Sequence, residues 1–390
     1  MDSIYLDHNA TTTLRPEAAA AIAAALRIGG NPSSVHAAGR QARRLIEDAR
    51  EQVAALVGAA PADVVFTSGG TEANALALAG LGPRRVLMSA VEHASVLRAA
   101  EAAELLPVDR HGVIRLDALE TALAAAPAAP TLVSVLWAGN ETGVIQPIAE
   151  VAALCRRYGA ILHSDAVQAA GRIPVDLRAA PVQLLSLSAH KLGGPMGVGA
   201  LIVDPALALQ PLLRGGGQER GLRAGTENLP GIAGFGAAAE RARALADAAR
   251  LTLLRDRLEQ RLRAICPAAP VFGAGGQRLP NTTCIGMPGV AAETQVIAFD
   301  LAGIAVSAGA ACSSGRVSRS DVLAAMGVGD DLAHSAIRVS LGWTTGEADV
   351  ERFIEVWTSI YARAAGRSAA LAAGRAETAT LGSRVGKVTR

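Results

Sequence analysis

Short apolar segments alternate with helical stretches between residues 60 and 205. These segments are Val64–Phe66, Arg85–Met88, Leu132–Trp137, Ala160–Leu162, Val182–Leu187 and Ala200–Val203. Strands that are buried on both faces of a parallel sheet have this composition, and the helical stretches supply the crossovers that parallel strands need. The pattern therefore predicts an α/β fold with a mainly parallel sheet, whose ligands bind beyond the carboxyl ends of the strands.

The pattern changes in the second half of the chain. Residues 237–265 read as one long helix rich in Ala, Arg and Leu, and strand-like segments follow near 281–287 and 336–341. We therefore predict a boundary near residue 250. The large domain then comprises residues 15–250, and a smaller α+β domain comprises residues 1–14 and 251–366. Residues 367–390 contain few large apolar side chains and are expected to fray.

Composition narrows the class of protein. The chain has 390 residues, 51% of them apolar, and 37 basic against 35 acidic residues, which indicates a globular protein with no polyanionic partner. The first twenty residues include acidic side chains and no apolar core of a leader, and no apolar stretch is long enough to span a membrane. We expect a cytoplasmic protein that binds neither nucleic acid nor membranes.

The four cysteines, Cys155, Cys266, Cys284 and Cys312, are too few for a disulfide framework, and their spacing fits no zinc site. No resident metal is expected, and each cysteine is judged as a lone thiol. Cys155 lies in a helical pattern and Cys284 in an alternating one, so packing explains both.

The ends of three predicted strands carry polar residues. Residues 67–74 are small residues that open a helix, where free N–H groups can hold a phosphate, although an ordinary capped helix start has the same composition. Asp165 ends the next strand and could equally cap a helix. Lys191 follows a third strand end, where a solvated cation is the usual role. Phosphate donors, an anion and an amine at one sheet edge are the parts that a pyridoxal-phosphate (PLP) site requires.

Ordered motifs give the chain a specific resemblance. They are Tyr-Leu-Asp-His-Asn-Ala-Thr-Thr from Tyr5, Asn-Pro-Ser-Ser-Val-His from Asn31, Glu-His-Ala-Ser from Glu92, Gly-Asn-Glu-Thr-Gly from Gly139 and Gly-Gly-Gly-Gln-Glu from Gly215. From about residue 4 to 362 the chain resembles class V, fold-type I PLP-dependent transferases, and among them the NifS-like cysteine desulfurases. The resemblance implies a homodimer that converts L-cysteine to L-alanine.

The resemblance also implies roles for single residues. Lys191 would form the Schiff base, Asp165 would face the pyridinium nitrogen, and Gln168 would donate to the ring hydroxyl oxygen. His93 would stack on the ring and help to move protons, although a lone histidine after an apolar strand is usually a core residue. The expected phosphate ligands are Gly70, Thr71, Ser188 and His190, with Thr226 reaching the phosphate of the neighbouring subunit.

Arg338 lies in an alternating segment, and its planar fork suits a carboxylate. An internal ion pair is the alternative. The resemblance implies that Arg338 and Asn140 bind the substrate carboxylate and that Asn140 also supports the cofactor.

Cys312 lies among small residues, from Ala308 to Gly315, and Arg316 and Arg319 follow nearby. A thiol on a flexible loop can meet the substrate sulfur and then present it outside, and the arginines would favour the thiolate. A buried cysteine in a tight turn is the alternative. The resemblance implies that Cys312 is the catalytic nucleophile, which carries a persulfide.

The persulfide would pass to an iron–sulfur scaffold or another acceptor protein, with a transient iron–sulfur contact possible at Cys312. Trp137 and the glycines from Gly215 are similar to the nitrogenase-linked branch. A selenocysteine lyase or a class V aminotransferase would share the cofactor site. A non-catalytic scaffold for cluster assembly would be expected to lack Lys191 or Cys312, and both are present.

Overall fold

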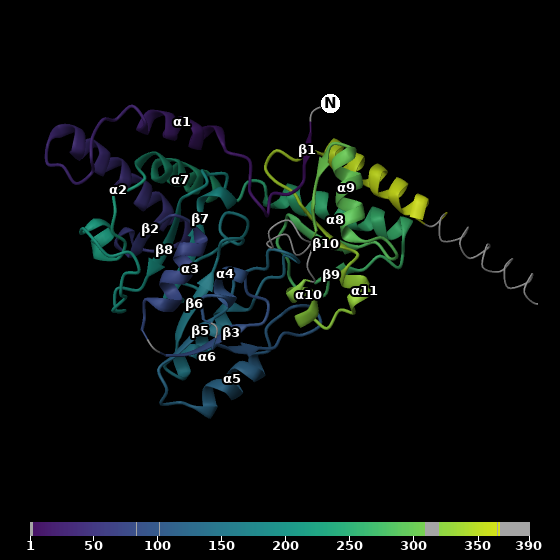
Figure 1. Ribbon diagram of the computed structural model, residues 1–390, viewed down its shortest axis with the longest axis horizontal. Helices are drawn as coiled ribbons and strands as arrows, with labels where there is room; N and C mark the ends of the chain where they lie inside the picture. The colour runs from purple at the N-terminus through teal and green to yellow at the C-terminus, as the bar shows by residue number, and fades with distance from the viewer. Residues whose placement is uncertain (1–2, 83, 101, 309–319, 365, 367–390) are drawn as a thin grey trace, which may run out of the picture.

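The computed structural model describes residues 3–82, 84–100, 102–308, 320–364 and 366. A mixed sheet forms the centre of the larger part of this described chain (Figure 1). Its strand order is β2 (Val64–Thr67), β8 (Gly199–Val203), β7 (Leu184–Ser188), β6 (Ile161–Asp165), β5 (Thr131–Ser134), β3 (Arg85–Ser89) and β4 (Glu104–Leu106). The strands from β7 to β4 run parallel, which confirms the α/β class.

The sheet is mainly parallel, as predicted, and one strand, β8, departs from this direction. β8 runs antiparallel to both of its neighbours, β2 and β7. The connection from Ser188 to Gly199 is ten residues long and contains only the 3₁₀ turn η2 (Ala189–Lys191). A parallel crossover needs a dozen or more residues, so this short connection returns the chain in the opposite direction.

Alternate residues of the strands enter two separate cores. In β2, Val64 and Phe66 pack on one face while Val65 packs on the other, and β8 divides in the same way. The first face is covered by α1 (Pro16–Ala25), α2 (Ala37–Val57), α5 (Leu116–Ala125), α6 (Ile148–Arg157) and α7 (Leu229–Ala242). The second face is covered by α3 (Gly70–Ala79) and α4 (Ala94–Leu97). Burial on both faces explains why the strands are continuously apolar.

A second, mainly antiparallel sheet forms the centre of the smaller part. Its order is β12 (Ser307–Ala308), β13 (Ala336–Ser340), β10 (Thr282–Gly286) and β9 (Val271–Phe272), which confirms the strand segments predicted near 281–287 and 336–341. Beside it, β1 (Ile4–Tyr5) pairs in parallel with β11 (Ile304–Ala305). Its helices are α8 (Ala248–Ile265), α9 (Ala292–Leu301), α10 (Asp321–Ala325), α11 (Asp330–Ala333) and one over residues 347–364. The chain therefore begins in this part and then crosses to α1.

The single helix predicted over residues 237–265 is wrong, because α7 ends at Ala242 and α8 begins at Ala248. Leu245 between them has φ 48°, a left-handed conformation that interrupts a helix. The apolar residues of α7 pack in the core of the large sheet, whereas those of α8 pack in the core of the small one. A straight helix cannot serve both cores. The domain bounds at residue 250 stay a prediction, and the predicted fraying of residues 367–390 lies outside the described residues.

A buried ion pair fixes the segment that follows β8. Arg50 of α2 donates from both of its Nη atoms to the Glu219 carboxylate at 2.8 Å. Glu219 also accepts from the Phe66 backbone N–H. Glu219 lies in η3 (Gln218–Gly221), where it has φ 46°. Arg50 stacks over the Phe66 ring at 4.8 Å. This pair therefore ties α2, β2 and η3 together.

We predict that Glu219→Gln lowers the free energy of unfolding of the apoprotein by about 3 kcal/mol, because it removes the buried carboxylate of Arg50 and leaves only the half-exposed Glu47 as its anion. Urea unfolding followed by circular dichroism measures the change. Asp176→Asn is the control, since it disrupts an ion pair with Arg178 whose side chains are 38% and 79% exposed. The interpretation fails if both variants unfold at the wild-type urea concentration.

Candidate active site

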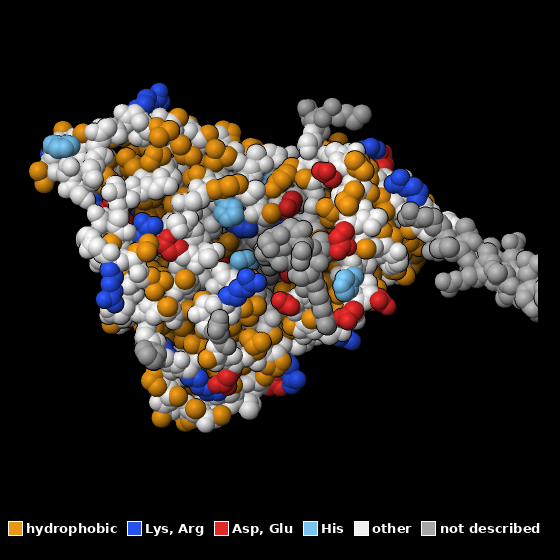
Figure 2. Space-filling model, viewed as in Figure 1, with side chains coloured by type: hydrophobic (Ala, Val, Ile, Leu, Met, Phe, Trp, Pro, Cys, Tyr) orange, Lys and Arg blue, Asp and Glu red, His pale blue; other side chains and the backbone are white. Residues whose placement is uncertain are grey.

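A cavity of about 380 Å³ lies at the carboxyl ends of the large sheet, where the two parts of the chain meet. It is lined by Asn9, Ala10, Gly70, Thr71, Asn74, His93, Ser95, Leu136, Ala138, Asn140, Asp165, Val167, Gln168, Ser188, His190, Lys191 and Arg338. Figure 2 shows histidine and basic side chains gathered in the middle of this face. Most of these residues lie at or after the ends of strands of the large sheet, while Arg338 comes from β13 of the small sheet. This is the edge at which the strand pattern predicts a ligand.

The first turn of α3 forms one end of the cavity. Gly70 and Thr71 are its first two residues, and the N–H groups of a first helical turn have no acceptor within the helix. A Cβ atom on Gly70 would lie 2.9 Å from Val167 Cγ2, so only glycine leaves this end of the cavity open. Ser188 and His190 lie on the same wall. The helix dipole and these donors favour a bound phosphate.

Asp165 is the last residue of β6 and presents an oriented carboxylate to the cavity. Its Oδ2 accepts from Asn74 Nδ2 at 2.7 Å, and its Oδ1 accepts from the Val167 N–H at 2.9 Å. Two donors hold the carboxylate in one orientation. The cavity therefore contains a fixed anion at the end of a central strand.

His93 is joined to the same network through Ser95. Asn74 Nδ2 also donates to Ser95 Oγ, which lies 2.7 Å from His93 Nδ1. The backbone N–H of Ser95 donates to His93 Nδ1 at 3.1 Å, so Nδ1 is the acceptor nitrogen. A neutral His93 therefore carries its proton on Nε2.

Lys191 ends η2, directly after β7, and its amine reaches the N-terminal segment. Its Nζ donates to the carbonyl oxygens of Asn9 and Ala10, the latter at 2.9 Å. Asn9 is itself anchored, because its side chain donates to Thr282 Oγ1 and its N–H donates to Ser340 Oγ, both at 2.9 Å. The position of the amine thus depends on contacts from the small sheet.

His190, beside Lys191, is neutral at physiological pH. Burial, and next the positive charges of Lys191 and Arg172, lower its pKa to about 4. Its Nδ1 lies 3.2 Å from Thr11 Oγ1. A neutral imidazole on this wall can donate one hydrogen bond without adding charge.

Arg338 forms an internal ion pair, which was the alternative to its predicted role in binding a substrate carboxylate. Its Nη2 donates to Asp7 Oδ1 at 2.7 Å, and its Nη1 donates to the Asn140 carbonyl at 3.4 Å. Its Nε is buried without a hydrogen-bond partner among the described residues. Arg338 still lines the cavity, so one guanidinium both pairs with Asp7 and faces the ligand space.

Two buried carboxyl groups lie behind the cavity wall. Glu92 Oε1 accepts from the Leu136 N–H at 2.6 Å, and burial raises the pKa of Glu92 well above its usual range. Glu141 accepts from Ser320 Oγ at 2.6 Å, and burial raises its pKa to about 7. Ser320 is the N-cap of α10 and the first described residue after 309–319. Glu141 thus holds the residue that caps the start of α10.

The structure brings most of the predicted site residues into one cavity. They are Gly70, Thr71, His93, Asn140, Asp165, Gln168, Ser188, His190, Lys191 and Arg338. Thr226 is exposed and lines a separate hollow with Ser68 and Arg223. Cys312, with its neighbours Arg316 and Arg319, lies outside the described residues. The roles assigned to all these residues stay predictions.

Sequence reasoning missed Asn9, Asn74, Ser95 and Arg172. Asn9 and Ser95 lie inside the motifs that begin at Tyr5 and Glu92, and Asn74 lies in the segment that opens α3. Their positions within these segments could have indicated that they belong to the site. Arg172 gave no signal, because an arginine in a polar loop usually faces solvent.

Other features of the described chain carry no site. Cys155 on α6, Cys284 on β10 and Cys266 are buried, and burial raises the pKa of Cys155 to about 12 and that of Cys284 still further. Packing therefore accounts for Cys155 and Cys284. Within the described ranges, no cluster of three His, Cys, Asp or Glu side chains is arranged to hold a metal. The helices of the same ranges include none with the length and apolarity that crossing a bilayer would require.

Comparisons with known proteins agree with this geometry. Residues 4–353 match the family model "Aminotransferase class-V". The chain is 46% identical to a cysteine desulfurase of Cereibacter sphaeroides over 91% of this chain and 95% of that one, and 44% identical to a cysteine desulfurase of Trichormus azollae over 93% and 94%. A NifS-like protein from Rickettsia africae superposes with a TM-score of 0.84 at 38% identity, covering 92% of this chain and 99% of that one. The chain belongs to the cysteine desulfurases of the class V aminotransferase family.

Members of this family depend on PLP, and the cavity of this desulfurase suits that cofactor. The N–H groups at α3 match a phosphate, the Asp165 carboxylate matches a protonated ring nitrogen, and the Lys191 amine matches an aldehyde. Asn74 Oδ1 is buried with no hydrogen-bond partner among the described residues, as is Arg338 Nε. Unsatisfied buried polar atoms in a cavity of this size indicate a site shaped for a polar ligand.

We predict that Glu141 makes the stability of this desulfurase depend on pH. Because its folded-state pKa is about 7, above the ordinary value of 4.5, the folded state binds the proton more tightly than the unfolded state. This contribution is complete below about pH 4.5 and is lost as the pH rises to about 7.

Glu141→Gln keeps a partner for Ser320 and removes the titration. The unfolding free energy of the variant minus that of the wild type should therefore increase between pH 5 and 7, by at most about 3 kcal/mol, and then level off. Taking the difference cancels the titration of other groups. A difference that stays constant over this pH range would contradict the assignment.

Proposed function

We propose that this cysteine desulfurase binds PLP in the cavity and transfers the sulfur of L-cysteine to Cys312, releasing L-alanine. The substrate C–S bond breaks, an S–S bond to Cys312 forms, and the carbon that loses sulfur gains a proton. The persulfide on Cys312 then contains the transferred sulfur. The observation that supports the proposal is the convergence of Lys191, Asp165, His93 and Arg338 on one cavity.

PLP, when bound, supplies an electron sink that stabilises negative charge on the substrate Cα. Asp165, oriented by Asn74 and Val167, would face the ring nitrogen and favour its protonated form. Lys191 would hold the cofactor aldehyde, and its amine would take the Cα proton of the substrate. The Lys191 amine has acceptors in the N-terminal segment, the carbonyls of Asn9 and Ala10.

Substrate orientation is assigned to Arg338 and Asn140. Arg338 has a buried Nε without a partner among the described residues, so a donor remains for a substrate carboxylate after the contact with Asp7. Asp7 fixes the guanidinium plane before substrate binds. A carboxylate held by this charged donor would place the substrate Cα near Lys191.

His93 is the candidate for proton transfer to the departing fragment. Because Nδ1 accepts from the Ser95 N–H, Nε2 carries the exchangeable proton. The ring position is fixed through Ser95, which accepts from Asn74, and Asn74 also donates to Asp165. The same chain of hydrogen bonds therefore orients both His93, the candidate acid, and the Asp165 carboxylate.

Cys312 is assigned as the sulfur acceptor on its sequence setting, since it lies outside the described residues. Burial keeps Cys155 and Cys284 protonated, because it raises the pKa of both thiols far above neutrality. A protonated buried thiol is a poor nucleophile, and the Cys266 thiol is also buried and inaccessible to a substrate, which leaves Cys312 as the better candidate. Selenocysteine lyase or aminotransferase activity is the alternative, and neither needs a persulfide on this cysteine.

Further parts of the proposal concern partners. We infer a homodimer in which Thr226 completes the phosphate site of the partner subunit, which fits its exposed position away from the cavity of its own chain. The sulfur would pass to an iron–sulfur scaffold or another acceptor protein, with a transient iron–sulfur contact at Cys312. A role in nitrogenase maturation and a cytoplasmic location are proposed on the sequence pattern alone.

We predict that Cys312→Ala retains the visible absorption of bound PLP but loses at least about 100-fold of L-cysteine-dependent sulfide and alanine production, because the nucleophile is absent. Lys191→Ala should lose the same activity together with the wild-type absorption band. The matched control is Cys155→Ala, which removes a buried thiol and should keep the activity.

Mass spectrometry after L-cysteine treatment should find one added sulfur on the peptide that contains Cys312. Production of alanine at the wild-type rate by Cys312→Ala would overturn the assignment of the nucleophile. A wild-type protein that binds no PLP would overturn the proposed function as a whole.

A further inference from the structure

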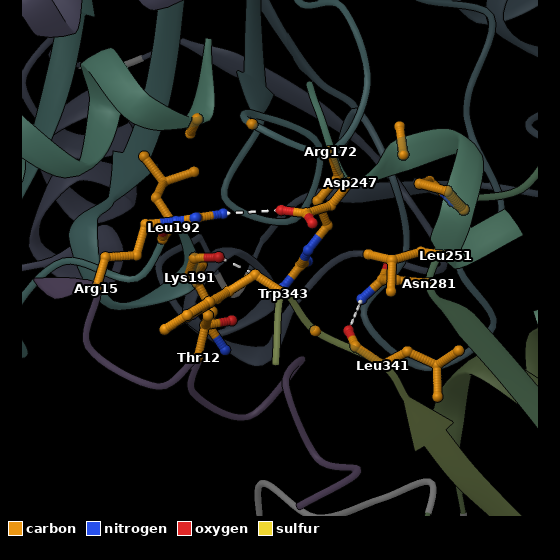
Figure 3. A pocket seen from close by; sticks show the side chains of 15 residues that line it. Thr12, Arg15, Arg172, Lys191, Leu192, Asp247, Leu251, Asn281, Leu341 and Trp343 are labelled. Carbon is orange, nitrogen blue, oxygen red and sulfur yellow. Dashed lines mark hydrogen bonds and ion pairs between the residues drawn. The ribbon is translucent and has the colours of Figure 1, made fainter. Parts of the chain in front are cut away.

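Arg172 is a buried arginine directly behind the candidate active site. It lies in the connection between β6 and β7, four residues after Gln168, and only 9% of its surface is exposed. Its Nη1 donates to the Gln168 carbonyl at 3.0 Å and to Gln168 Oε1. Its Nη2 donates to the His8 carbonyl at 3.1 Å and lies 3.5 Å from the Lys191 carbonyl. Figure 3 shows Arg172 and Lys191 in a second, smaller pocket that both residues line.

The acceptors around Arg172 are neutral. Among the described residues, its hydrogen bonds go to three backbone carbonyls and one side-chain amide, and no carboxylate pairs with it. Burial, and next the charge of Arg338, lower the pKa of Arg172 to about 9, which still leaves it charged at neutral pH. A buried cation without an anion is costly, so its retention suggests a role in the site.

The contact with Arg172 decides which way the Gln168 amide faces. A guanidinium has only donors, so the amide atom that it contacts must be the oxygen. The amide nitrogen, Nε2, then lies on the other side and donates to the Asn9 carbonyl at 3.0 Å. The same carbonyl accepts from Lys191 Nζ. Arg172, Gln168, Asn9 and Lys191 therefore form one chain of hydrogen bonds along the wall of the cavity.

We propose that Arg172 is a positioning residue that locks the Gln168 amide with its N–H₂ group toward the cofactor and places an uncompensated positive charge behind the Lys191 amine. The inference rests on the proposed function, because the group that Gln168 meets is taken to be the ring hydroxyl oxygen of PLP. The oriented amide strengthens the binding of the ring oxygen, and the positive charge disfavours a proton on the nitrogen that joins Lys191 to the cofactor.

Other charged groups also act on this nitrogen. Asp165 on β6, His93 before α4, His190 in η2 and Arg338 on β13 line the same cavity. Asp7 neutralises Arg338 in part, whereas Arg172 has no such partner among the described residues. Since the other groups are the same in each variant, substitution of Arg172 isolates its contribution.

The test uses the full-length protein loaded with PLP. The midpoint of the pH-dependent change in visible absorption reports the charge, and the dissociation constant of PLP from the apoprotein, measured by fluorescence, reports the amide contact. For Arg172→Gln we expect a midpoint raised by about 0.5 to 1 pH unit and PLP binding weakened about tenfold. Arg172→Lys keeps the charge but cannot lock the amide, so it should retain the midpoint and still bind PLP several-fold more weakly.

Arg178→Gln is the matched control, because Arg178 lies on the same connection, is 79% exposed and contacts only Asp176 among the described residues. It should leave both measurements unchanged. Circular dichroism of each apoprotein checks folding. If Arg172→Gln does not fold, Arg172→Lys decides, since wild-type PLP binding in that variant would overturn the amide lock.

The outcomes separate this inference from the proposed function. A wild-type protein that binds no PLP or shows no visible band overturns the proposed function. Wild-type protein that binds PLP, together with a folded Arg172→Gln variant that matches it in midpoint and affinity, overturns only the role of Arg172. A purely structural role for Arg172 is overturned if the absorption midpoint of Arg172→Gln moves while the apoprotein of that variant keeps the wild-type thermal stability.

Discussion

The candidate site depends on the hydrogen bonds of one residue, Asn9. Its backbone carbonyl accepts from Lys191 and Gln168 of the large part, while its N–H and side chain bond to Ser340 and Thr282 of the small sheet. Asn9 is 1% exposed, so these bonds are made away from water, where an unmade bond would be costly. The cores of the large and the small sheet are separate, and the hydrogen bonds of Asn9 join the two parts beside the Lys191 amine.

Charge is distributed over the site in an uneven way. Asp165 supplies a fixed anion at one end of the cavity, and Arg338 and Arg172 supply cations elsewhere, only the first of which has a carboxylate partner among the described residues. His190 is kept neutral by burial and by its cationic neighbours. A phosphate and a carboxylate entering such a cavity would supply negative charge near these cations, and a ligand that binds only the folded state stabilises it.

Local sequence predicted much of the fold because the strands of the large sheet are buried on both faces. Such strands are apolar throughout, and their ends are marked by polar residues such as Asp165 and Lys191, so the position of the site could be read from the chain. The antiparallel direction of β8 was not predicted, although the short connection before β8 was a usable signal for it. The break at Leu245 was hidden, since residues 237–265 contain no glycine or proline, and only the packing of α7 and α8 in different cores separates them.

Contacts between distant residues account for the rest of what sequence could not supply. The bonds of Arg172 to the His8 carbonyl and of Asn9 to Thr282 join segments more than 150 residues apart. Nothing in the residues near Arg172 indicates that it is buried. Residues grouped in short motifs, such as Gly70 and Thr71, could be predicted from the sequence. The first turn of a single helix provides the N–H groups at their end of the cavity, so no distant contact was needed to find them.

The antiparallel return at β8 limits how the segment that carries Lys191 could vary in evolution. The ten residues from 189 to 198 are held at one end by β7 and at the other by β8, and β8 is itself paired on both edges. An insertion in this connection would have to bulge outward or shift the register of an interior strand. Substrate range in proteins built this way is therefore freer to change through the opposite wall of the cavity, contributed by the small sheet, than through the segment that carries the amine.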